Sequence, residues 1–223
     1  VCVARAAPSL HAVDFRAVGL EGYGRVGNYL ARQLKTWSRN FAEADRAVQA
    51  HLRRPKISQA MDELISYLHE HMVQGEPTCI LHGDLSCINA IAHPTEPRVV
   101  ALIDWELSTL GHPMVDLNFL SSTLPGGYRS RIREGSKAAA GFPSQWGFVE
   151  EYHRLRGLPV ISRKQWDYFT VFNMFRSVAI THGAYARALR GSVFSDKGGE
   201  FLLGEFTHIL RMAMATIGGA SKL

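Results

Sequence analysis

Three oxygen-bearing side chains follow one another at a spacing that suits phosphoryl transfer. Asp84 comes after an apolar run that ends at Leu81, Asn89 follows five positions later, and Asp104 ends a second apolar run, 99–103. A carboxylate can orient a hydroxyl nucleophile and accept its proton, so Asp84 is the candidate base. Mg²⁺ prefers hard oxygen ligands, which the Asn89 amide and the Asp104 carboxylate supply. This order therefore predicts transfer of the γ-phosphoryl group of ATP to a hydroxyl.

The flanking sequence predicts the elements that would hold these residues together. A short strand at 78–81 leads into the loop 82–89, which carries the base and one metal ligand on a single backbone segment. If 89–92 and 99–103 pair as a hairpin, Asp104 returns to the same place. Taken alone, either aspartate is more simply explained as a helix cap or a turn former. The combined spacing favours the phosphotransferase site.

The motif resembles a known family. The residues His82-Gly83-Asp84, Asn89 and Asp104-Trp105-Glu106 are similar to those of the aminoglycoside phosphotransferase and choline kinase-like family. The extension 107–117 most closely resembles the phosphotransferase domains fused to acyl-CoA dehydrogenases. The resemblance implies an α+β, mostly helical fold like the C-terminal lobe of a protein kinase. It also implies ATP and Mg²⁺ as cofactors, with Asn89 and Asp104 binding the metal and the nucleotide.

The resemblance also marks His82, Glu106 and Asp116 as supporting residues. In the family, the counterpart of Asp116 supports the catalytic loop by hydrogen bonding; the alternative is an aspartate placed early in a helix by the helix dipole. Two positions depart from the family. Ser86 stands where a cation is common, which puts the rate of transfer in question, and His112 stands where an aspartate is more frequent.

The resemblance further implies an upstream β-rich lobe that clamps the nucleotide. The residues before His82 are expected to be helical, so we expect that lobe to be missing and residues 1–223 to form a single domain. A noncatalytic kinase-like binding module, or an inactive fragment, is therefore the alternative function. Binding of Mg-ATP distinguishes the two interpretations.

Hydrophobic spacing predicts the remaining elements. We expect residues 1–8 to be helical, 10–14 to form a helix end and turn, and 125–143 to form a loop rich in glycine, serine and arginine. Further helices are expected at 27–50, 58–74, 113–123, 145–156, 162–190 and 198–217. The segment 22–27 matches G-x-G-x-x-G, but no clear strand precedes it, so we interpret it as a loop that orders a helix start.

Composition limits the classes of protein and partner. The chain has 223 residues, a net charge of +5 and 46% apolar residues, which suits one globular domain. No recognition motif for nucleic acid, transmembrane run or signal peptide is evident. The three cysteines are odd in number and form no C-x-x-C pair, which favours a reducing compartment in the cytoplasm or an organelle matrix. The positive charge favours an anionic hydroxyl substrate, such as a hydroxyacyl thioester, over a polycationic aminoglycoside.

Overall fold

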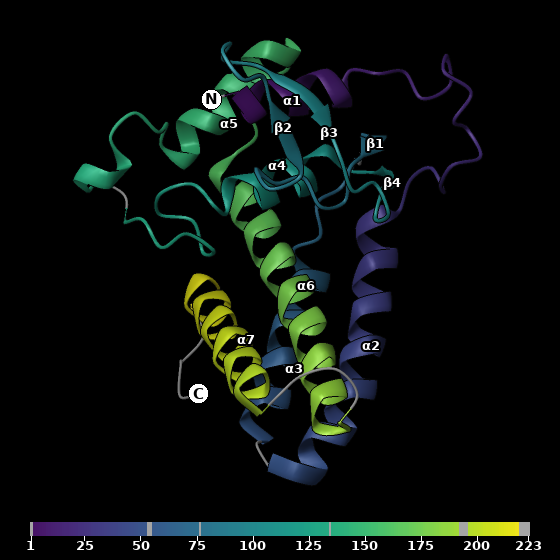
Figure 1. Cartoon of the computed structure of the whole chain (residues 1–223). Helices are drawn as coiled ribbons and strands as arrows, with labels where there is room; N and C mark the ends of the chain where they lie inside the picture. Colours follow the sequence, from purple (N-terminus) through teal and green to yellow (C-terminus); the bar gives the residue numbers. More distant parts are fainter. Residues whose placement is uncertain (1, 53–54, 76, 134, 192–195, 219–223) are drawn as a thin grey trace. The chain divides into compact units, whose positions relative to one another are not determined.

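The computed structural model describes residues 2–52, 55–75, 77–133, 135–191 and 196–218. The described chain is mainly helical, with two small antiparallel sheets of two strands each (Figure 1). It divides into two compact units. Unit 1 contains residues 1–29 and 74–166, and unit 2 contains residues 30–73 and 167–223. The expectation of a single domain stays a prediction.

Unit 1 holds the strands and the short helices. Strand β1 (Cys79–Leu81) pairs with β4 (Thr109–Gly111), and Ile80 lies opposite Leu110. Strand β2 (Ala90–Ala92) pairs with β3 (Val99–Leu102), with a bulge after Ile91. The hairpin predicted from 89–92 and 99–103 is therefore confirmed. Strand β4 was not predicted, because its three residues show no alternation and only the pairing with β1 makes them a strand.

Four helical elements complete unit 1. Helix α1 (Cys2–His11) packs against β1, β3, α4 (Pro113–Ser121) and α5 (Gln145–Arg156). A short 3₁₀ turn, η1 (Lys137–Ala139), lies in the segment that was expected to be a loop. Pro113 opens α4 because proline fits the first helical position. All nine residues of α4 are buried, so this helix forms the centre of the unit.

In unit 2, the structure describes four long helices. These are α2 (Tyr29–Leu52), α3 (Pro55–Glu70), α6 (Arg163–Leu189) and α7 (Asp196–Thr216), although the first residues of α2 and α6 belong to unit 1. The predicted helices agree with these bounds to within a few residues. Helix α3 begins at Pro55 rather than at Ser58 and ends at Glu70 rather than near residue 74.

A buried cluster joins the helices of unit 2. The His182 ring on α6 stacks on Phe41 of α2, with ring centroids 4.6 Å apart, and meets the edge of Phe206 on α7 at 4.9 Å. The Nε2 atom of His182 lies 3.0 Å from Oδ1 of Asp45, whose other oxygen accepts from Ser58 of α3 at 2.5 Å. The core of unit 2 thus combines apolar packing with buried hydrogen bonds.

The segment that matches G-x-G-x-x-G is a series of turns. No strand precedes it in the described chain, which confirms the interpretation as a loop before α2. Gly24 is required there because a Cβ atom would lie 2.9 Å from the backbone nitrogen of Leu110 on β4. Gly27 has a φ of 74° and leads into the helix.

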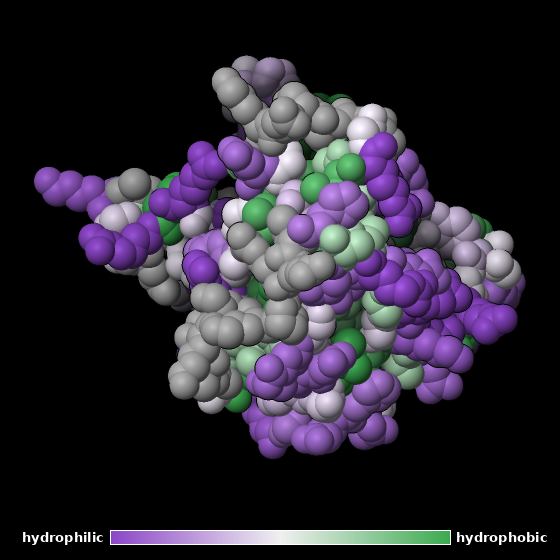
Figure 2. Space-filling view, turned by 90° about the horizontal axis from the view of Figure 1, so that it is seen from below, coloured by the Kyte–Doolittle hydropathy of each residue, from purple (hydrophilic) through white to green (hydrophobic). Residues whose placement is uncertain are grey.

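The surface is predominantly polar on the face shown in Figure 2, with small apolar areas between charged side chains. Scattered apolar residues of this kind are normal on a protein surface. Within the described ranges, every helix is too short or too polar to cross a membrane.

Candidate active site

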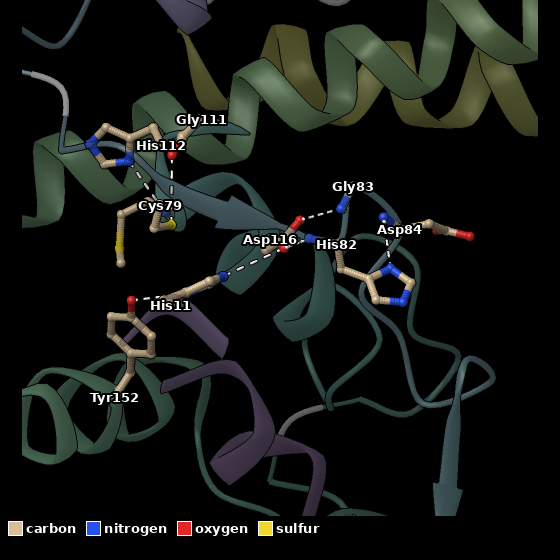
Figure 3. A network of polar contacts seen from close by, with 10 residues as sticks. His11, Cys79, His82, Gly83, Asp84, Gly111, His112, Asp116 and Tyr152 are labelled. Atoms are coloured by element: carbon tan, nitrogen blue, oxygen red, sulfur yellow. Dashed lines mark hydrogen bonds and ion pairs between the residues drawn. The ribbon is translucent and has the colours of Figure 1, made fainter. Parts of the chain in front are cut away.

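A tight turn follows β1 and carries the candidate base. Gly83 has a φ of 85°, and a Cβ atom there would lie 2.1 Å from the backbone oxygen of Leu107. Only glycine fits this position without a shift of the backbone. The turn leaves the Asp84 carboxylate pointing away from Asp116 (Figure 3) and partly accessible.

Asn89 returns to Asp84 across the loop. Its side-chain Nδ2 donates to the backbone oxygen of Asp84 at 2.9 Å and to the Asp84 carboxylate oxygen Oδ2 at 2.9 Å. These two bonds use both hydrogens of the amide nitrogen. The amide oxygen of Asn89 accepts no hydrogen bond from the described residues, so it is the atom left to bind a ligand.

The end of β3 brings Asp104 to the same loop. The backbone nitrogen of Ile103 donates to the backbone oxygen of Asn89 at 2.9 Å, and Nε2 of His82 lies 2.9 Å from the backbone oxygen of Ile103. Asp104 is the next residue, with an exposed side chain and a φ of 66°. A left-handed conformation is uncommon for a residue other than glycine and costs energy.

His82 and Asp116 hold the catalytic turn through hydrogen bonds to its backbone. Asp116, in the first turn of α4, accepts hydrogen bonds from the backbone nitrogens of His82 at 2.6 Å and Gly83 at 3.0 Å. The His82 ring packs 4.6 Å from that of Trp105, and its Nδ1 lies 3.4 Å from the backbone nitrogen of Asp84. The carboxylate of Asp116 is thus used by the loop and is not merely an early-helix charge.

Glu106 and Ser86 contribute less. Glu106 is exposed in the turn after Asp104, and none of the described residues joins its carboxylate to the loop, so its supporting role stays a prediction. Ser86 is buried, with 7% of its surface exposed, and it carries no charge toward the site.

Two cysteines near the site are free thiols. Cys87 is exposed and Cys79 is buried.

The donor set fits a magnesium ion in its chemistry. The Asn89 amide oxygen and the Asp104 carboxylate are hard oxygen donors. Among the residues that the structure describes, no group of three or more histidine, cysteine, aspartate or glutamate side chains could hold a metal. Two protein ligands are nevertheless what Mg²⁺ commonly takes, because it keeps several waters and phosphate oxygens in its shell.

His112 caps α4. Its Nδ1 accepts a hydrogen bond from the backbone nitrogen of Met114 at 3.2 Å, in place of the acidic cap that is frequent in the family. Burial, together with the nearby His11, lowers the pKa of His112 to about 4. The imidazole is therefore neutral at physiological pH, as an acceptor must be.

One contact of the site was missed in the sequence. The Nε2 atom of His11, on α1, lies 3.5 Å from the Asp116 carboxylate. His11 and Asp116 are 105 positions apart, and neither spacing nor composition connects them. The tertiary packing of α1 against α4 alone brings them together.

Comparison with known proteins identifies the family of the chain. Residues 3–158, which include the whole candidate site, match the sequence model of the phosphotransferase enzyme family. The chain belongs to the phosphotransferase enzyme family. The predicted resemblance is therefore confirmed, and so is the mostly helical α+β fold. The expected absence of an upstream lobe concerns sequence before residue 1 and stays a prediction.

The chain also resembles segments of much longer proteins. Acyl-CoA dehydrogenase family member 10 of Mus musculus is 34% identical over 194 residues, which cover 83% of this chain and 17% of that protein. Acyl-CoA dehydrogenase family member 11 of Gallus gallus is 35% identical over 199 residues, or 86% of this chain and 24% of that protein. The chain thus spans less than a quarter of the length of these relatives.

A solved structure also resembles this phosphotransferase-family chain. The Ralstonia eutropha protein named "putative aminoglycoside phosphotransferase" is 32% identical, with a TM-score of 0.79 over 96% of this chain and 64% of that one. A choline kinase from Streptococcus pneumoniae shares the fold at 18% identity, with a TM-score of 0.50 over 94% of this chain and 63% of that one.

Proposed function

We propose that the protein transfers the γ-phosphoryl group of ATP to a hydroxyl of a small molecule, with Asp84 as the base and Asn89 and Asp104 as ligands of Mg²⁺. One observation supports this most directly. The Nδ2 atom of Asn89 is held by Asp84, which leaves the amide oxygen for a cation. A bound Mg²⁺ ion would neutralise the charge on the phosphate oxygens.

Each residue of the candidate site has a separate role in the proposed reaction. Asp84 orients the hydroxyl of the substrate and accepts its proton. The bond from the hydroxyl oxygen to the γ-phosphorus forms while the bond from that phosphorus to the bridging oxygen breaks and ADP leaves. Asn89 fixes the Asp84 carboxylate through the bond to Oδ2. His82 and Asp116 hold the turn, so Asp84 reaches the substrate without a conformational search.

Replacement of the base tests the proposal. Asp84→Asn keeps the size of the side chain but removes the proton acceptor, so we expect turnover to fall by about 10²- to 10⁴-fold. The measurement is ATP consumption with a panel of anionic, neutral and cationic hydroxylated substrates. Asp62→Asn, on the exposed side of α3, is the matched control and should leave the rate unchanged. Full activity of the Asp84→Asn variant would refute the assignment.

The substrate class follows from charge. The chain carries a net charge of +5, which attracts anions and repels polycations. We therefore propose an anionic hydroxyl substrate, such as a hydroxyacyl thioester. Turnover of cationic amino sugars alone in the same panel would contradict it.

A noncatalytic binding module is the second candidate. It is favoured by Ser86, which offers no charge where the family commonly has a cation. Calorimetry with Mg-ATP separates the two functions, because an active transferase must bind the nucleotide. Absence of binding by the full natural protein would support the module.

A further inference from the structure

A buried chain of polar side chains runs from helix α5 to the catalytic turn (Figure 3). The Tyr152 hydroxyl lies 2.9 Å from Nδ1 of His11, and Nε2 of His11 lies 3.5 Å from Oδ2 of Asp116. The same oxygen of Asp116 accepts from the backbone nitrogen of His82. We propose that His11 and Tyr152 are positioning residues that set the place of the catalytic turn through Asp116. The proposal rests on the proposed function in one respect, namely that this turn presents the reacting carboxylate.

The donor in the hydrogen bond between His11 and Asp116 can be assigned. An ionised Asp116 only accepts, so Nε2 of His11 must donate to it. The other ring nitrogen, Nδ1, faces the Tyr152 hydroxyl at 2.9 Å. The polar contacts thus run from Tyr152 through His11 to Asp116.

Burial makes these contacts significant. His11, Tyr152 and Asp116 each have 3% or less of their surface exposed. Water does not compete for hydrogen bonds at such depth, and a donor or acceptor left alone there carries its full desolvation cost. A change at Tyr152 therefore acts on Asp116 through His11 rather than being absorbed by solvent.

Burial raises the pKa of the Tyr152 hydroxyl above its ordinary value. Cys79 and Asp116 also raise that pKa, although the positive charge of Arg156 and its hydrogen bond to the Tyr152 hydroxyl oppose this. Burial also raises the pKa of Cys79, and the charge of Asp116 adds to that effect. Tyr152 thus remains a hydroxyl donor at neutral pH.

Helices α1 and α5 pack against each other where His11 and Tyr152 meet. The rings of His11 and Tyr152 meet edge to face with centroids 5.7 Å apart, and the two helices are in contact along this region. Because Asp116 bonds to His82 and Gly83 directly before Asp84, a displaced carboxylate moves the base. Small misplacements of a reacting group reduce turnover without weakening the binding of substrate.

Three substitutions separate this role from a general effect on folding. Tyr152→Phe removes only the hydroxyl. His11→Asn keeps an acceptor near Tyr152 but is too short to reach Asp116, whereas His11→Gln places its amide nitrogen where Nε2 was. Tyr168→Phe is the matched control, because it removes a hydroxyl from a buried tyrosine that lies in unit 2 and not in unit 1.

Two measurements are made on each variant. Amide exchange at His82 and Gly83 reports the bonds to Asp116, and steady-state kinetics give kcat and KM for ATP. We expect Tyr152→Phe and His11→Asn to speed exchange at both amides about 10-fold and to lower kcat about 5- to 10-fold, with KM within about twofold. His11→Gln should restore part of both, because it regains a donor toward Asp116 but has no acceptor at the position of Nδ1, and Tyr168→Phe should change neither.

Each outcome decides the proposal. Unchanged exchange at His82 and Gly83 in the His11→Asn variant would overturn it, whatever the activity. Faster exchange with an unaltered kcat would also overturn it, because the network would then be structural only. If turnover survives Asp84→Asn yet falls in His11→Asn, the proposed base is wrong while the positioning role stands.

Discussion

Gly83 combines a positive φ with the closest backbone approach in the catalytic turn. The backbone oxygen of Leu107 occupies the space where a Cβ atom would be, at 2.1 Å. Asp104 also has a positive φ, of 66°, but it carries a side chain and therefore holds strain that the surrounding bonds must offset. A positive φ is thus relaxed at Gly83 and strained at Asp104. The strained residue, Asp104, is the proposed metal ligand.

Gly83→Ala should be more damaging than an ordinary substitution of glycine. We expect a loss of unfolding free energy of about 3 kcal/mol or more, because backbone atoms must move in addition to the cost of the positive φ. Gly157→Ala is the matched control, since Gly157 has a φ of 62° with open space around it and should cost about 1 kcal/mol. Denaturant unfolding measures both. Equal losses would contradict the proposed clash.

Among the elements, α4 does most to connect the fold with the site. It begins at Pro113, is capped by His112 and presents Asp116 to the catalytic loop from its first turn. A neutral imidazole replaces the usual carboxylate or hydroxyl at the cap. The cap is therefore sensitive to pH in a way that an asparagine would not be.

The stability of the protein should fall between pH 6.5 and 4 because of His112. The pKa of His112 is about 4 in the folded protein, against an ordinary value of 6.5, so the unfolded chain takes up the proton first and folding is disfavoured as the pH falls. The full effect is about 3 kcal/mol. His112→Asn keeps a capping acceptor but does not titrate. Unfolding measured from pH 7 to pH 4 should show a steeper loss for the wild type, and parallel curves would contradict the assignment.

At the scale of the whole molecule, the chain crosses between its two units three times. The boundaries fall after residues 29, 73 and 166, so unit 2 is assembled from two separate stretches. Its buried pair of Asp45 and His182 joins those stretches. Burial favours a higher pKa for Asp45, but hydrogen bonds from His182, Ser58 and Gln49 outweigh it and lower the pKa. Asp45 is therefore ionised at neutral pH and depends on its partners.

Asp45→Ala should destabilise the protein by about 3–5 kcal/mol, because it leaves His182 buried without its partner. Glu43→Ala is the control on the same helix: Glu43 faces Arg39 at 4.0 Å on the surface and should cost less than about 1 kcal/mol. Single-tryptophan variants that keep either Trp37 or Trp105 report on unit 2 and unit 1, respectively. Coincident transitions from both probes would support the predicted single domain, and separate transitions would contradict it.

The sequence by itself determined the family, the helices, the hairpin and the order of Asp84, Asn89 and Asp104. These depend on local spacing and on a motif whose members lie within a few dozen residues, so they can be read along the chain. The family resemblance also indicated that Asp116 supports the catalytic loop. The tertiary structure decided that β4 pairs with β1, that Asp116 accepts from the backbone nitrogens of His82 and Gly83, and that His11 lies beside Asp116. Such contacts join residues up to 141 positions apart, as in the pair of His11 and Tyr152. These contacts form only because packing brings distant segments together, and no periodicity in the sequence predicts which segments will meet.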